Sequence, residues 1–157
     1  MANYQKLQTA TALNIVSTDN ANIPYPNVIE TGTATSVVAN QLVDSAATFS
    51  TLNVQTGDVV YNNTTLLAAT VVNVLNNTTI VLNANIFLAS GDSYTIYAQN
   101  GKEACVLYVG TGGKLRVMTA SGQDVLFNNI LGGSFLPVQV LKVFKTGTTA
   151  TDLVALW

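Results

Sequence analysis

The stretch that decides the fold begins Cys105-Val-Leu-Tyr-Val-Gly-Thr-Gly-Gly-Lys-Leu-Arg-Val-Met-Thr119 and continues to Trp157. Short apolar and β-branched runs alternate there with clusters of Gly, Ser, Thr and Asn, which is typical of short strands joined by tight turns. Leu115 and Val117 fall on one face of such a strand and the charged residues beside them on the other, because strand side chains alternate with period two. The sequence therefore predicts an all-β fold, a small sandwich or barrel of short antiparallel strands arranged as a meander.

The carboxy-terminal segments carry apolar residues at both odd and even positions, near residues 138–144 and 153–157. One small sheet cannot cover two apolar faces by itself, so we expect this unit to associate with further copies of itself. The indole of Trp157 is expected to be packed, either in the core or at the subunit contact. The residues expected at the subunit contact are Val138, Val140, Phe144, Leu153 and Trp157.

Residues 31–99 are expected to form a second β unit, again a small barrel or sandwich, with about five short strands. Asn62-Asn63, Asn76-Asn77 and Ser90-Gly91-Asp92 mark its turns, since these residue types accept turn conformations and bond to nearby backbone. Strand patterns cover residues 58–61, 64–75, 79–82 and 94–97, and residues 31–38 and 41–43 are also expected to be extended.

Three tyrosines of this second unit, Tyr61, Tyr94 and Tyr97, allow two interpretations. In the first they form an outward-facing surface, an aromatic platform on which a sugar ring could stack. In the second they pack in the core or rim of the unit, as the large apolar part of a tyrosine side chain favours. The outward-facing surface is the candidate ligand site of this unit.

Residues 1–29 are expected to form an extended arm, because Pro24 and Pro26 fix φ and remove two backbone donors. The arm lies either across a neighbouring subunit or on the core of its own chain. No apolar stretch typical of a secretory signal stands at residues 1–10, so we expect synthesis and use without export.

The composition is apolar and poor in charge, with 48% hydrophobic and 9% charged residues against about 25% charged in typical soluble domains. We expect partner subunits to cover much of the apolar surface. No run approaches ~18 apolar residues, so membrane insertion is not expected. Residues 30–100 hold four acidic and no basic residues, a charge of −4, and the remainder holds six basic and four acidic residues, +2. This division suggests an acidic part facing outward and a mildly basic part facing an acidic partner.

The residue types exclude several chemistries. The chain has no His, which removes the commonest general base and metal ligand. Residues 110–114 resemble a phosphate loop only superficially, because Leu115 stands where Ser or Thr is needed, and a hairpin turn is expected there. The lone Cys105 is expected to be a buried small hydrophobe rather than a reactive thiol. We therefore expect no catalytic residue, cofactor or metal site, and six scattered basic residues predict no nucleic-acid binding.

Several motifs carry a resemblance to a known family. Leu-Tyr-Val-Gly at 107–110, Gly-Gly-Ser-Phe-Leu-Pro-Val at 132–138 and the Thr-rich segment with terminal Leu-Val-Ala-Leu-Trp at 146–157 resemble the small head-spike base proteins of gene transfer agents and tailed phages. Residues 19–24 are similar to the amino-terminal element of that family. Residues 42–49 and 57–62 resemble β modules that recur as insertions in marine phage structural proteins.

The resemblance implies a division of the chain and a function. Residues 1–30 and 100–157 would form one discontinuous spike-base-like unit, and residues 31–99 an inserted module whose ends lie close together. The implied function is a non-enzymatic virion protein, an oligomeric head-spike base or capsid decoration subunit made in the cytoplasm of a bacterial host. Its implied partners are other copies, capsid or other virion proteins, a spike fibre and a host polysaccharide. A polysaccharide-binding module of the virion and a tail or neck structural protein are the alternatives.

Overall fold

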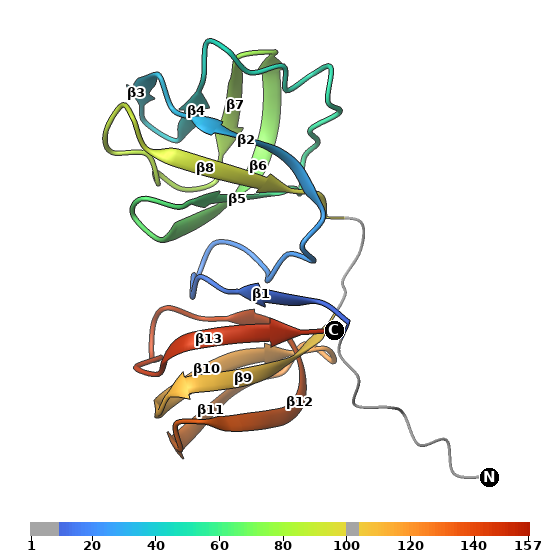
Figure 1. Ribbon diagram of the computed structural model, residues 1–157, viewed down its shortest axis with the longest axis vertical. Helices are drawn as coiled ribbons and strands as arrows, with labels where there is room; N and C mark the ends of the chain where they lie inside the picture. Colours follow the sequence, from blue (N-terminus) through green and yellow to red (C-terminus); the bar gives the residue numbers. More distant parts are fainter. Residues whose placement is uncertain (1–9, 100–103) are drawn as a thin grey trace, which may run out of the picture.

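The computed structural model describes residues 10–99 and 104–157, and its regular structure consists of strands. The strands form two antiparallel sheets, one of six and one of seven strands, that pack on one another. The predicted all-β fold is confirmed. Figure 1 shows the sheets as two lobes stacked along the long axis of the molecule.

We call the lobe built from the six-stranded sheet the C-terminal lobe and the other the middle lobe. The C-terminal lobe contains β1 (Ala12–Asn14), β9 (Cys105–Thr111), β10 (Gly113–Thr119), β11 (Asp124–Ile130), β12 (Ser134–Val143) and β13 (Thr151–Leu156). The middle lobe contains β2 (Val28–Thr33), β3 (Ser36–Val38), β4 (Gln41–Val43), β5 (Val59–Asn62), β6 (Leu67–Asn76), β7 (Thr79–Leu82) and β8 (Ser93–Tyr97).

The strands of the C-terminal lobe do not follow sequence order. Their order is β1-β13-β9-β12-β10-β11, so the predicted meander is wrong. The predicted hairpin at residues 110–114 is also wrong, because β9 pairs with β12 and β13 while β10 pairs with β11 and β12. A Cβ atom on Gly112 would meet the backbone of Ile130 and Gly132, so glycine permits a close approach where the chain crosses between layers.

Strand β12 belongs to both layers of this lobe. Its beginning, Ser134 to Leu136, pairs with β9 and its end, Lys142 and Val143, pairs with β10, while Val140 pairs with both strands. The register on β9 shifts between Leu136 and Val140. Pro137 stands in this irregular stretch, where its missing N–H interrupts no regular ladder. We call β1, β13, β9 and the first half of β12 the first layer, and the second half of β12 with β10 and β11 the second layer. The core of the lobe includes Leu107, Val109, Leu115, Val117, Leu136, Val140, Val143, Leu153 and Ala155.

The middle lobe closes on itself. Its strand order is β2-β8-β5-β6-β7-β4-β3, and the two end strands β2 and β3 follow each other in the chain. Between them, the Ala34 N–H donates to the Asp92 carbonyl (2.9 Å) and the Thr35 N–H to the Val43 carbonyl (2.8 Å). Hydrogen bonding therefore runs around the lobe as in a small barrel, without a long free edge. Its core includes Leu42, Phe49, Val60, Ile80, Phe87, Tyr94 and Ile96.

Residues 10–27 connect the lobes and lie on the chain's own structure, the second of the two alternatives for the arm. Strand β1 pairs with β13, and the Thr18 N–H donates to the Val143 carbonyl (2.9 Å). The Thr18 hydroxyl donates to the carbonyl of Ala68 in the middle lobe (3.1 Å). A third buried cluster fills the junction, with Ala21 from the arm and Val59, Tyr61, Ala68 and Tyr97 from the middle lobe.

The chain leaves the junction and returns to it at one place. Val28 is paired with Tyr97, and the Ala98 N–H donates to the Asn27 carbonyl (2.9 Å). Strand β2 begins at Val28 and so crosses the boundary expected after residue 30. Residues 1–9 and 100–103, which the expected division also includes, lie outside the described residues.

Candidate interaction surface

The first layer of the C-terminal lobe has an apolar outer side. Because Leu107 and Leu153 point into the core, the residues next to them along the strands point outward. The register places Phe135 opposite Tyr108 on β9, and Tyr108 opposite Val154 on β13. We call this surface the uncharged face; it consists of Ala12, Val106, Tyr108, Phe135, Val154 and Leu156.

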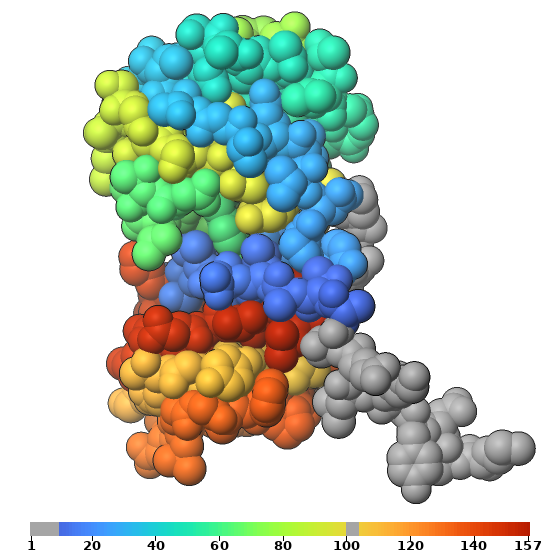
Figure 2. Space-filling view, in the orientation of Figure 1, coloured from blue at the N-terminus to red at the C-terminus, as the bar shows by residue number. Residues whose placement is uncertain are grey.

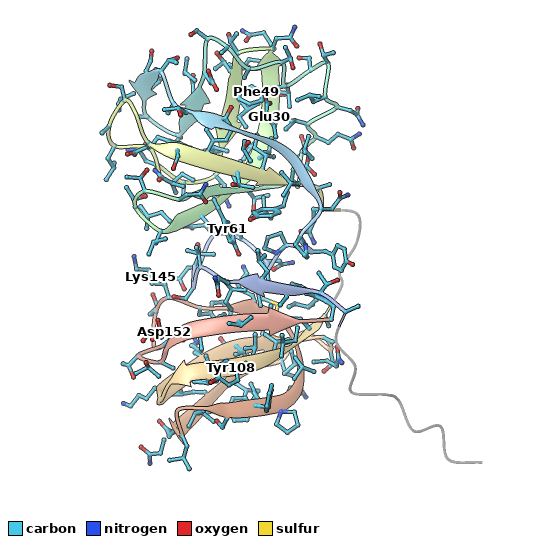
Figure 3. The ribbon with its side chains drawn as sticks, in the orientation of Figure 1. Glu30, Phe49, Tyr61, Tyr108, Lys145 and Asp152 are labelled. Carbon is cyan, nitrogen blue, oxygen red and sulfur yellow. The ribbon has the colours of Figure 1, made fainter. Side chains whose placement is uncertain are left out.

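Aromatic side chains stand at one side of the uncharged face. The rings of Tyr108 and Phe135 pack edge to face with centroids 5.4 Å apart, yet Phe135 remains 62% exposed. In Figure 2 the residues of β13 and β9 form part of the visible surface, and Figure 3 labels Tyr108 on β9. The first carboxylate beyond the face on β13 is that of Asp152, which accepts a hydrogen bond from the Thr111 hydroxyl (2.7 Å).

The outer side of the second layer is charged by contrast. Arg116 on β10 forms a two-point pair with Asp124 on β11, Nε to Oδ1 at 2.9 Å and Nη2 to Oδ2 at 2.6 Å. Hydrogen bonding to Arg116 lowers the pKa of the Asp124 carboxyl. The Phe144 ring lies under the Arg116 guanidinium, 4.7 Å from the ring centroid, with the Lys142 ammonium at 5.6 Å. One outer side of the C-terminal lobe is therefore apolar, and the other is charged.

The residues expected at a subunit contact lie in three different environments in the structure. Val140 and Leu153 lie in the lobe's own core, where no partner could reach them. Val138 and Trp157 are partly buried against the same core, Trp157 with Tyr25 edge to face at 5.4 Å. Phe144 is half-buried beside its two cations on the charged side. Sequence reasoning missed the uncharged face, although apolar residues at adjacent positions in 105–109 and 153–157 carried its signal.

The expected outward-facing tyrosine surface is wrong, because all three side chains are buried. Tyr94 is 1% exposed and packs against Phe49 and Phe87 in the middle-lobe core. Tyr61 and Tyr97 pack edge to face at 5.2 Å in the junction cluster, where Figure 3 shows Tyr61. Burial raises the pKa of each phenol, since the charged form would lose its hydration. Their apolar bulk is needed inside this small lobe.

The acidic residues of the middle lobe also point inward, which contradicts the expected acidic outer surface. Asp44 accepts the Tyr94 hydroxyl hydrogen bond (2.8 Å), and Asp58 accepts from the Gln55 N–H (2.8 Å). Asp92 accepts from the Asn62 side-chain amide (2.9 Å). All three carboxylates are buried, because they satisfy turn and core donors that water cannot reach. These three acidic residues are therefore structural.

Glu30 differs from the other acids. Its Oε2 atom is buried and has no hydrogen-bond partner among the described residues. Burial raises the pKa of the Glu30 carboxyl above its usual value, because the charged form loses hydration. A hydrogen bond from the Thr48 backbone lowers the pKa by a smaller amount, and the charge of Asp44 adds to the rise.

Cys105 is buried, as expected, and burial raises the pKa of its thiol to about 12, which keeps it protonated and unreactive. Within residues 10–99 and 104–157 no three Cys, Asp or Glu side chains lie close enough together to hold a metal ion. No helix in these ranges has the length and apolar character needed to span a membrane.

Comparison of the chain with known protein families, curated proteins and solved structures finds no match.

Proposed function

We propose that this chain is a non-enzymatic structural subunit of a tailed-phage particle, a head-spike base or capsid decoration protein that acts as a homo-oligomer. The observation that carries the proposal is the uncharged face. Large apolar side chains there, including the 62% exposed Phe135, lie side by side on a folded chain with only 9% charged residues. Such a contiguous surface is suited to contact with another protein.

The partner best matched to this face is a second copy. Neither copy would bury a charge, so the contact avoids the desolvation cost of several kcal/mol that an unpaired ion would bring. The area of the uncharged face limits the strength of this contact. Four strands about 4.8 Å apart and about five residues long give on the order of 300 Å² per copy. A standard stable interface needs about 800 Å² per partner, so this contact alone would give weak, concentration-dependent association.

A lysine placed in the contact tests the proposal. Phe135→Lys should abolish the concentration dependence of the sedimentation coefficient, because it would bury a charge between two apolar faces. Leu88→Lys is the matched control, since Leu88 is also 62% exposed but lies in the middle lobe. Unchanged association of Phe135→Lys, or equal loss in both variants, would contradict the use of this face.

The location on the particle needs a separate experiment. The resemblance of residues 107–110, 132–138 and 146–157 to head-spike base proteins supports a position on the head. Antibody labelling of purified particles in negative stain should therefore decorate heads. Label on tails or necks would favour the alternative structural role, and protein found only in the lysate would refute a virion role altogether.

The polysaccharide-binding alternative no longer has its original support. It depended on an aromatic platform of Tyr61, Tyr94 and Tyr97, and these side chains are buried. We do not propose that function for the middle lobe.

A further inference from the structure

A cleft of about 420 Å³ opens at the junction of the two lobes and the arm. Its size falls within the range of about 300 to 1,000 Å³ that small-molecule sites occupy. The cleft is lined by Asn20, Ala21, Asn22, Gly57, Val59, Thr70, Gln99 and Lys142.

Hydrogen bonds from the middle lobe hold the arm side of the cleft in place. The Thr70 hydroxyl donates to the Asn20 carbonyl (3.0 Å), and the Asn83 amide donates to the same oxygen (2.7 Å). Ala21 and Val59 are 2% and 1% exposed and belong to the junction cluster, so they supply a small apolar base. The middle lobe therefore holds the arm side of the lining in place by hydrogen bonds and by packing.

Lys142 is the one charged side chain among the lining residues. Its ammonium donates to the Asp19 carbonyl at 3.4 Å, a long hydrogen bond, and has no carboxylate within ion-pair distance in the described residues. The Asp19 carboxylate is engaged elsewhere, by the Thr146 hydroxyl (2.7 Å) and N–H (3.2 Å). Lys142 therefore keeps hydrogen-bond donors for a ligand, whereas Arg116 in the same lobe is fully paired with Asp124.

The other polar groups of the cleft are neutral. The side-chain amides of Asn20 and Asn22 form no hydrogen bond with the rest of the described chain, and each can both donate and accept. The Thr70 hydroxyl uses its proton on Asn20 and keeps its lone pairs for a donor. One cation beside amides and a hydroxyl suits a small molecule that carries a carboxylate and several hydroxyl groups.

We propose that this cleft binds an acidic sugar residue, a uronate, with its carboxylate at Lys142 and its hydroxyls at Asn20, Asn22 and Thr70. The proposal goes beyond the structural role and does not depend on it. A neutral sugar lacks a group for the lysine, and the lining has no aromatic ring on which it could stack. A phosphate ester suits the site less, because a single lysine is its only charged donor.

Titration of the ¹⁵N-labelled full-length chain tests the inference. Glucuronate should shift the backbone amide signals of Asn20, Asn22 and Thr70 in a saturable way, and glucose and acetate should bind markedly more weakly. Acetate that binds as well as glucuronate would reduce the cleft to a simple anion site. Glucose that binds equally well would show that the charge is not used. Either result, or no saturable shift with glucuronate, would overturn the proposal.

Matched lysine variants locate the site. Lys142→Gln should weaken glucuronate binding about tenfold or more, the effect of losing one charge-assisted hydrogen bond. Lys114→Gln removes an exposed lysine of the same lobe and should leave binding unchanged. Asn22→Asp should also weaken binding, through repulsion of the carboxylate. Thermal melts matching the parent protein would exclude misfolding, and full affinity in Lys142→Gln would overturn the assignment.

Discussion

At the scale of single residues, the middle lobe holds two side chains in positions that ordinary residue preferences disfavour, Glu30 and Leu66. Glu30 keeps a buried carboxylate oxygen without a partner, and Leu66 is a 67% exposed leucine at φ 54°. Bulky residues rarely adopt positive φ, because the Cβ atom crowds the backbone. Both residues therefore cost stability that the rest of the lobe offsets, and both give direct predictions.

Glu30→Gln should stabilise the protein at neutral pH by less than about 1 kcal/mol, since it removes a partly desolvated charge next to Asp44 that solvent still screens. Between pH 4.5, the ordinary pKa of the unfolded chain, and the raised pKa, the folded state keeps a proton on Glu30 that the unfolded chain has released. Stability of the parent protein should therefore fall as pH rises from 4.5 through the raised pKa, and stay level above it. Urea unfolding from pH 4 to 8 should show this fall in the parent and its reduction in Glu30→Gln. An unchanged pH profile in the variant would contradict this account.

Leu66→Asn should raise the free energy of unfolding by about 0.5 to 1 kcal/mol, because Asn tolerates positive φ better than Leu. Leu88→Asn is the control, a comparably exposed leucine (62%) without positive φ, and should change stability by less than about 0.5 kcal/mol. A loss of stability in Leu66→Asn alone would show that the leucine makes contacts worth more than its strain.

Tyr94→Phe should destabilise the middle lobe by about 1 to 3 kcal/mol, because it leaves the buried Asp44 carboxylate without the hydroxyl donor at 2.8 Å. Tyr25→Phe, in an exposed tyrosine, should have little effect. Chemical denaturation of both variants beside the parent makes the comparison. Equal stability of Tyr94→Phe and the parent would mean that the remaining donors satisfy Asp44.

At the scale of elements, the crossing between β9 and β10 determines the shape of the C-terminal lobe. Gly112 lies against backbone of the turn between β11 and β12, so the two layers meet there without room for a side chain. Strand β12 makes the second crossing through its irregular stretch at 136–140. Together these crossings separate the charged second layer from the uncharged face of the first.

Gly112→Ala should cost about 1 to 3 kcal/mol or more, because the added methyl group meets backbone atoms that cannot rotate away. Gly133→Ala tests a different cause nearby, since its φ is 73° and nothing lies within 4 Å of an added Cβ. That variant should cost only about 1 kcal/mol, from backbone conformation alone. Melting temperatures rank the two, and a Gly112→Ala protein as stable as the parent would show that the layers can separate there.

At the scale of the whole molecule, the lobes are joined by buried apolar contacts as well as by chain connections. Leu13 and Val16 from the arm pack against the cluster that holds Tyr61 and Tyr97. The hydrogen bond between Asn27 and Ala98 brings the two connections of the middle lobe together. Because the two connections lie close together, a folded unit can be inserted between them at little entropic cost to the rest of the chain.

Replacement of residues 28–98 by a short Gly/Ser linker should give a protein that still folds, because its core between the two layers is complete without the middle lobe. It should melt at a lower temperature than the parent, since the junction cluster becomes exposed. Calorimetry measures both the cooperativity of the melt and the melting temperature. A non-cooperative melt would show that the two lobes share one folding unit.

The sequence by itself determined the local structure. Period-two alternation with Gly, Asn and Asp turns gave the all-β class, and strand β7 was predicted at its observed residues, 79–82. These features depend on neighbouring residues, which is why a single sequence can show them. The burial of Cys105 followed in the same way, from its place within an apolar strand.

Only the tertiary structure decided which strands pair and which side chains reach the surface. The β9-β12 and β13-β9 pairs join residues distant in sequence, and no local pattern encodes that order. Tyr61, Tyr94, Tyr97 and the acids Asp44, Asp58 and Asp92 became interior when the middle lobe closed around them. Equally, adjacent apolar residues such as Leu153 and Val154 point to opposite sides of β13, and long-range packing alone fixes which of the two sides is covered.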